Sequence, residues 1–325
     1  MPYYLTTKQN YIMNIWIIGA GIIAQEYGKV LSSLGYDYTV IGRGEQSAAK
    51  YKEVTGKDVV IGGLEAYLST SPTPADKAIV ATNLNSLSDN TIQLIKYGVK
   101  EIFCEKPGFL YPEECASVLE AAKEKNAHVY LAYNRRFFAS VIKAQKIIEE
   151  DGGVKSFNFE FTEWGHVIQN LDKPKGDLEN WMYANSTHVI DLAFFLGGNP
   201  VQMNSFTAGE LSWHKPAVFA GAGVTDKGAL FNYAANWAAP GRWGVEILTS
   251  MHRLYLRPME QLQIQNIGSM AINPVEIDDH LDKEFKPGFY LETKAFVEGE
   301  GSRLCSIEEQ FNHVHEVYNR IKGLE

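Results

Sequence analysis

Residues 14–24, NIWIIGAGIIA, decide the fold of this chain. A short apolar run ends at Gly19, and the pattern G-x-G-x-x-A continues through Gly21 into a segment with helical spacing of its apolar residues. In this setting Gly19 permits a tight turn, and Gly21 lets a pyrophosphate approach the backbone. The N–H groups that open the helix, around Ile22 and Ile23, are free to bind phosphate. The stretch therefore predicts a dinucleotide-binding unit.

The sequence on both sides of this motif extends the same pattern up to about residue 132. Apolar segments alternate with helical ones, and the apolar segments are continuous rather than alternating, as in a parallel sheet that is covered on both faces. The predicted strands are residues 14–18, 38–41, 59–61, 76–81, 101–104 and 128–132. The predicted fold class is α/β, with an N-terminal doubly wound parallel sheet of the Rossmann type.

The pattern changes after about residue 136. Residues 154–162 alternate strictly, with Phe157, Phe159 and Phe161 on one side, as expected for a half-exposed strand of an antiparallel sheet. Similar segments recur at 230–237, 245–249, 253–256 and 261–265, and helices are predicted at 188–196, 288–296 and 307–321. We therefore predict a dinucleotide-binding domain at 1–135. An α+β domain with a large open, mainly antiparallel sheet follows at 136–325 and serves substrate binding and oligomerisation.

Composition excludes several classes of partner. The 325 residues include 39 acidic and 30 basic side chains, a net charge of −9 that does not favour nucleic acid or an anionic membrane. Cys104, Cys115 and Cys305 are too few and too scattered for a disulfide framework or a zinc site, so we expect no metal. The first 13 residues lack the apolar block of a signal peptide, and no segment is long and apolar enough to span a membrane. We expect a cytoplasmic protein.

The end of the second strand bears on the choice of cofactor. Dinucleotide folds that bind NAD carry an acidic residue there, which hydrogen-bonds the ribose hydroxyl. This chain has Arg43 instead, with Ser47 nearby, and a guanidinium suits a 2′-phosphate. The sequence therefore predicts NADP in preference to NAD. Glu45 would oppose this interpretation if its side chain turned inward.

Two further motifs carry residues suited to acid–base chemistry. Lys106 lies in Glu105-Lys106-Pro107, directly after the fifth strand, where doubly wound folds bind their ligands. Its ammonium would stabilise the charge that develops on a substrate oxygen. His188 follows Ser186 and Thr187, either of which would cap a helix. At the start of that helix the dipole would keep the imidazole neutral and able to exchange a proton with an alcohol.

Taken together, GAGIIA, CEKP, YNRRF (residues 133–137) and HVIDLAFFLGG (residues 188–198) resemble the Gfo/Idh/MocA family of NAD(P)-dependent sugar oxidoreductases over nearly the whole chain. The resemblance implies that Lys106 and His188 flank the reacting hydroxyl or carbonyl. It also places Glu105 near the nicotinamide ribose. Thr82 and Asn83 match positions that line the cofactor. The candidate substrate contacts are Asn134, Arg135, Trp164, Asn185 and His188.

One departure keeps alternatives open. Many family members carry an aspartate four residues before the histidine, whereas this chain has Ala184. We predict an oxidoreductase that moves a hydride between NADP(H) and a secondary alcohol or ketone of a sugar or sugar derivative, with or without a nucleotide. A non-catalytic sensor that binds NAD(P) is the alternative. A dinucleotide reductase that acts on other carbonyls is a third. The resemblance also implies a homodimer or homotetramer.

Overall fold

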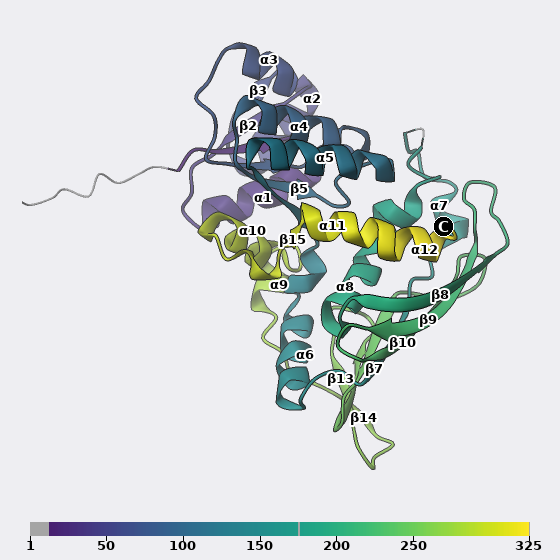
Figure 1. Ribbon diagram of the computed structural model, residues 1–325. Helices are drawn as coiled ribbons and strands as arrows, with labels where there is room; N and C mark the ends of the chain where they lie inside the picture. Colours follow the sequence, from purple (N-terminus) through teal and green to yellow (C-terminus); the bar gives the residue numbers. More distant parts are fainter. Residues whose placement is uncertain (1–12, 175, 325) are drawn as a thin grey trace, which may run out of the picture.

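The computed structural model describes residues 13–174 and 176–324, which form two sheets with helices packed against them (Figure 1). Most of the N-terminal segment on which the signal-peptide argument rests, residues 1–12, lies outside the described residues. Among the helices that the structure describes, none has both the length and the apolar character to cross a bilayer.

The first sheet has seven strands in the order β15-β6-β5-β4-β1-β2-β3. They are β1 (Ile15–Ile18), β2 (Thr39–Gly42), β3 (Val59–Ile61), β4 (Lys77–Val80), β5 (Glu101–Glu105), β6 (His128–Ala132) and β15 (Cys305–Ser306). All pairs are parallel except β15 with β6. Side chains of β1 alternate between two cores, because Ile15 and Ile17 pack on one face and Trp16 and Ile18 on the other. Burial on both faces explains the continuous apolar runs.

Helices cover both faces of this sheet. The helices of the first half are α1 (Ile22–Ser33), α2 (Glu45–Thr55), α3 (Gly63–Ser69), α4 (Leu87–Tyr97) and α5 (Pro112–Lys125). A short 3₁₀ turn, η2 (Asn134–Phe137), leads into α6 (Ala139–Glu150) and the second domain. The predicted Rossmann fold is confirmed.

The second sheet has eight strands in the order β14-β13-β12-β11-β7-β10-β9-β8. They are β7 (Ser156–Glu160), β8 (Pro200–Ala208), β9 (Val218–Thr225), β10 (Leu230–Asn236), β11 (Gly244–Leu248), β12 (His252–Leu256), β13 (Gln263–Asn266) and β14 (Ile272–Pro274). All pairs are antiparallel except β7 with β10, so the predicted mainly antiparallel sheet is confirmed. Phe157, Phe159 and Phe161 share the buried face, as their spacing predicts.

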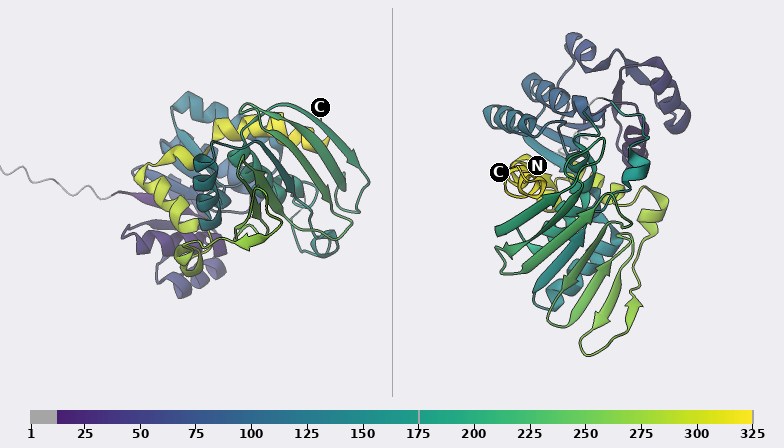
Figure 2. Two further views of the ribbon diagram at one scale, coloured as in Figure 1. Left: turned by 90° about the horizontal axis from the view of Figure 1, so that it is seen from below. Right: turned by 90° about the vertical axis from the view of Figure 1, so that its right-hand side faces the viewer.

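Helices α6 and α8 (Thr187–Gly197) pack on one face of the second sheet. Before α8 lie the short α7 (Gly165–Ile168) and a π-helical turn, η3 (Met182–Ser186). No helix of the described residues covers the opposite face (Figure 2). Apolar side chains are exposed there, such as Phe206 at 71% and Leu230 at 63%.

The C-terminal segment returns to the first domain. It contains α9 (His280–Glu284), α10 (Phe289–Glu298), β15, α11 (Ile307–His313) and α12 (Asn319–Lys322). Helix α10 packs on α1, and β15 extends the first sheet beside β6. Helices α11 and α12 then run from α5 toward β8, between the two domains (Figure 1). The domain boundary at residue 135 stays a prediction. The sequence analysis did not foresee that β15 and α10, near the C-terminal end, pack with the first domain.

Candidate active site

The turn between β1 and α1 leaves room for a ligand beside its backbone. Gly19 has a φ of +117°, and a Cβ there would lie 2.3 Å from the carbonyl oxygen of Ala81. At Gly21 an added Cβ would meet no heavy atom within 4 Å, so the space beside it is open. No described side chain caps the start of α1. The free N–H groups of its first turn suit a pyrophosphate.

A cavity of about 470 Å³ adjoins this turn. Of the predicted cofactor contacts, it is lined by Gly19, Gly21, Arg43, Ser47, Thr82 and Asn83. Glu45 is not among its lining residues and begins helix α2 instead. None of the described lining residues is acidic. The Arg43 guanidinium is therefore the charged group at this end of the cavity.

A second cavity, of about 860 Å³, shares Gly21, Ala81, Thr82 and Asn83 with the first and continues toward the second domain. Of the other predicted site residues, it is lined by Ile22, Ile23, Glu105, Lys106, Asn134, Arg135, Asn185 and His188. Because the two cavities share lining residues, the two domains contribute to one continuous cleft.

Trp164 does not line this cleft. Its ring is 49% exposed, its Nε1 donates a hydrogen bond to the carbonyl of Gly241 (3.1 Å), and the Arg242 guanidinium lies over its face at 4.9 Å. The structure therefore does not bring Trp164 together with the other predicted substrate contacts. The aromatic residues that line the cleft include Trp181, Phe138 and Phe289, and Trp243 packs against His188.

Lys106 follows β5, and its ammonium donates a hydrogen bond to the main-chain carbonyl of Ala184. The residue that replaces the expected aspartate therefore contacts the lysine through its backbone. Burial lowers the pKa of Lys106 to about 8, and the nearby Glu105 carboxyl opposes part of this shift.

His188 is 7% exposed, and its Nδ1 has no hydrogen-bond partner among the described residues. Burial lowers the pKa of His188 well below its usual value, and the positive charges of Arg135, Lys106 and Lys286 lower it further. A pKa lowered in this way leaves the imidazole neutral at pH 7.

The predicted cause of this neutral state is wrong. Ser186 donates to Glu163, and Thr187 donates to the carbonyl of Tyr183, so neither caps α8. The chain enters α8 through the π-helical turn η3. His188 is thus not at a free helix N-terminus, and burial with nearby cations takes the place of the helix dipole.

Glu105 lies at the end of β5 and accepts a hydrogen bond from the hydroxyl of Tyr27 (2.7 Å). Burial raises the pKa of Glu105 above its usual value. Glu292 of α10 lies in the same region and is fully buried, and neither of its carboxyl oxygens has a hydrogen-bond partner among the described residues. Burial and the nearby Glu105 raise the pKa of Glu292 well above its usual value.

Sequence reasoning missed two groups of residues at this site. The first is Glu163, 2% exposed, which accepts hydrogen bonds from Asn185 (3.0 Å) and Ser186 (2.8 Å) and so holds the backbone next to Lys106. The second comprises Lys286 and Pro287 of the turn before α10 and Phe289, the first residue of that helix, all of which line the cleft. The sequence K-P-G before a helical segment was the available signal for this turn.

The turn before α10 is tied to the predicted substrate contacts. Asn134 donates a hydrogen bond to the carbonyl of Pro287 (2.9 Å). Gly288 has a φ of +77°, and a Cβ there would lie 2.1 Å from the carbonyl oxygen of Asn134. The loop before η3 also contributes to the cleft, through Asp172, Lys173, Pro174 and Asp177.

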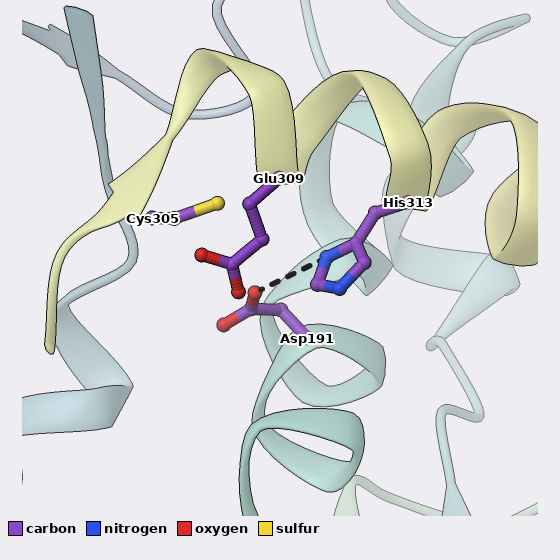
Figure 3. Close-up of side chains that lie close together, drawn as sticks. All are labelled: Asp191, Cys305, Glu309 and His313. Atoms are coloured by element: carbon purple, nitrogen blue, oxygen red, sulfur yellow. Dashed lines mark ion pairs between the residues drawn. The ribbon is translucent and has the colours of Figure 1, made fainter. Parts of the chain in front are cut away.

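A cluster of possible metal ligands lies outside this cleft. Asp191, Cys305, Glu309 and His313 bring their ligand atoms within 4.8 Å of one another (Figure 3). Arg136, however, binds both carboxylates, at 2.5 Å from Asp191 and 2.7 Å from Glu309. Its guanidinium supplies the positive charge that a metal would bring. Asp191 thus holds Arg136 rather than the start of α8.

Residues 13–133 match the family model GFO_IDH_MocA, an oxidoreductase family with an NAD-binding Rossmann fold. An uncharacterised oxidoreductase from Streptococcus pneumoniae serotype 4 is 27% identical over 200 residues, which cover 60% of this chain and 53% of that protein. Levoglucosan dehydrogenase from Pseudarthrobacter phenanthrenivorans is 31% identical over 119 residues, or 33% and 29% of the two chains. The matches thus span about half, or less, of the length of these relatives.

The fold is shared over nearly the whole chain with a solved structure, levoglucosan dehydrogenase in complex with NADH and L-sorbose. The TM-score is 0.76 at 17% identity, and the match covers 96% of each chain. At this identity the likeness concerns the fold. The second domain therefore has the same fold in both proteins.

Proposed function

We propose, because residues 13–133 match the model of the Gfo/Idh/MocA oxidoreductase family, that this protein is an NADP-dependent dehydrogenase or reductase. It moves a hydride between the cofactor and a secondary alcohol or ketone carbon of a sugar or sugar derivative. The observation that carries the proposal is that Lys106 and His188, from different domains, line one cavity that continues into the cleft beside Gly19 and Gly21. The levoglucosan dehydrogenase relative supports a sugar as the substrate class.

The residues present suit a nicotinamide dinucleotide. The uncapped start of α1 and the open space at Gly21 accept the pyrophosphate. Arg43 and Ser47 line the same cavity, and a guanidinium suits a 2′-phosphate, which supports NADP over NAD. When bound, the nicotinamide supplies the hydride acceptor or donor.

The protein supplies orientation and proton transfer. A general acid or base works best with a pKa near the working pH, and Lys106, with a pKa of about 8, meets this condition. We therefore assign to Lys106 the exchange of a proton with the substrate oxygen. His188, held neutral by burial, accepts a hydrogen bond from the hydroxyl and orients it. This division differs from the sequence prediction, which gives the proton transfer mainly to His188.

The experiment is steady-state kinetics of Lys106→Ala with a panel of sugars, together with a fluorescence titration with NADPH. We expect kcat to fall by roughly 10²- to 10⁴-fold while NADPH binding is kept. Lys123→Ala, on the exposed end of α5, is the matched control. Full activity of Lys106→Ala would contradict the assignment. NADPH binding by the unmodified protein without turnover of any sugar would favour the non-catalytic sensor.

The predicted homodimer or homotetramer belongs to the same proposal. The bare face of the second sheet, with Phe206 and Leu230 exposed, is the surface that a second copy would cover. The cytoplasmic location stays a prediction.

A further inference from the structure

Two adjacent arginines of η2 differ in how their charges are balanced. Arg136 binds the carboxylates of Asp191 and Glu309. Arg135 forms no ion pair within 4.0 Å with any described residue, and its hydrogen bond goes to the neutral amide oxygen of Asn134 (3.0 Å). Its Nε is buried and has no acceptor. A guanidinium offers five N–H donors, so most of those of Arg135 are left over.

The position of Arg135 is fixed by rings rather than by an anion. Its guanidinium lies 5.1 Å from the ring centroid of Trp243 and 5.8 Å from that of Phe138. It lines the same cavity as Lys106 and His188, and its charge is one of the causes of the low pKa of His188. Burial lowers the pKa of Arg135 to about 10, so the guanidinium is still charged at neutral pH.

No described carboxylate forms an ion pair with Arg135 within 4.0 Å, although Glu260 and Glu292 act on its charge at longer range. Lys106 and Lys286 also lack an ion pair among the described residues, which leaves three cations near His188. The acidic residues that line the cavity are Glu105, Asp172, Asp177 and Glu260, and none of them forms an ion pair with these cations within 4.0 Å. A buried charge without an opposite charge nearby lowers the stability of the protein. A ligand that carries a negative charge would compensate it.

We infer that the substrate carries an oxyanion close to the carbon that reacts, and that Arg135 binds this group. A guanidinium donates two parallel N–H bonds to a carboxylate or a phosphate ester, and stacking on Trp243 presents it ready for this contact. The inference rests on the proposed function and narrows its substrate class to acidic sugars, either sugar acids or sugar phosphates.

The test compares sugars that differ in a single group. With saturating NADP, initial rates are measured for sets of hexoses and pentoses that carry a terminal CH₂OH, a carboxylate or a phosphate ester. We expect kcat/KM to favour one of the two anionic forms over the neutral form by at least about tenfold. The preferred anion then distinguishes a sugar acid from a sugar phosphate.

Substitutions connect this preference to Arg135. Arg135→Gln is expected to raise KM for the anionic substrate by about 10- to 100-fold with a smaller change in kcat, since a hydrogen bond to a charged group is lost. Arg135→Lys, which keeps the charge, should restore part of the loss. The control is Arg242→Gln, because Arg242 stacks on the same Trp243 (5.0 Å) but is not among the residues that line the cavity.

The outcomes separate this inference from the proposed function. Equal or better turnover of neutral sugars, or an unchanged KM in Arg135→Gln, would overturn the inference and leave the oxidoreductase in place. Failure of every anionic sugar to react, or to change the fluorescence of bound NADPH, would also overturn it. Failure of the unmodified protein to bind NADPH would instead contradict the proposed function.

Discussion

At the scale of single residues, Arg43 offers a test of the proposed preference for NADP. It lines the cavity next to the glycine turn, where none of the described lining residues is acidic. We expect Arg43→Ala to weaken NADPH binding by about 10- to 100-fold, because a charge-assisted hydrogen bond to the 2′-phosphate is lost. NADH binding should stay the same. Fluorescence titrations with both cofactors measure this, and an equal loss of NADH binding would show that Arg43 does not select between them.

Glu292 gives a prediction about pH. Burial and the nearby Glu105 raise its pKa in the folded protein, whereas in the unfolded chain it is ordinary. When the pH lies between these two pKa values, Glu292 is protonated in the folded state and ionised in the unfolded state. The free energy of unfolding therefore falls as the pH rises through this range. Glu292→Gln mimics the protonated form. We expect its Tm to exceed that of the unmodified protein, with a gap that widens from pH 5 to pH 8.

The control for this prediction is Glu276→Gln, at an exposed position outside the cleft. It should leave the pH dependence of Tm unchanged. A Tm gap for Glu292→Gln that is constant across this pH range would mean that the side chain does not titrate differently in the two states.

At the scale of elements, the two glycines of the turn between β1 and α1 are expected to have different roles, Gly19 in folding and Gly21 in ligand binding. A Cβ at Gly19 would clash with the Ala81 carbonyl at 2.3 Å, whereas one at Gly21 would enter open space. We expect Gly19→Ala to lower the free energy of unfolding, because the backbone there is also at positive φ. Gly21→Ala should fold normally but weaken NADPH binding by tenfold or more.

Chemical denaturation and cofactor titration of the two variants provide the measurements. Normal NADPH affinity in Gly21→Ala would show that the pyrophosphate does not approach this turn. Normal stability of Gly19→Ala would contradict the steric argument.

The sequence predicted the elements whose burial leaves a clear pattern. The central strand β1 is apolar throughout because both of its faces are covered, whereas β7 alternates because only one of its faces is covered. Strands β8 and β9 were missed because they bury few side chains and so have no apolar period. In the candidate site, the sequence alone could locate the residues that lie in recognisable motifs, such as Gly19, Lys106 and His188. Lys286 and Glu163 could not, because only the folded chain brings them to the cleft.

At the scale of the whole molecule, Arg136, Asp191 and Glu309 join three elements, η2, α8 and α11. Asp191→Asn removes one of the two carboxylates that bind Arg136, while Glu309 still compensates its charge. We therefore expect this variant to lower the free energy of unfolding by about 1.5–3 kcal/mol, the contribution of a hydrogen bond to a charged group. Urea denaturation followed by circular dichroism measures the effect.

The control is Asp226→Asn, on the loop after β9, because Asp226 forms no ion pair with Arg136. It should lower the stability less, since its carboxylate accepts a partly exposed backbone hydrogen bond from Asn199. An equal loss of stability in the two variants would mean that the buried ion pair between Arg136 and Asp191 contributes no more to stability than an exposed hydrogen bond.

Strand β15 has a consequence for how the protein is made. It pairs with β6 through Cys305 and Ser306, so the edge of the first sheet is completed by residues that lie about 170 positions further along the chain. A ribosome synthesises the first domain long before this strand, and an uncovered strand edge invites pairing with other chains. During translation the β6 edge therefore waits, unpaired by β15, until nearly all of the second domain has emerged. Chaperones that shield nascent strands would act in that interval.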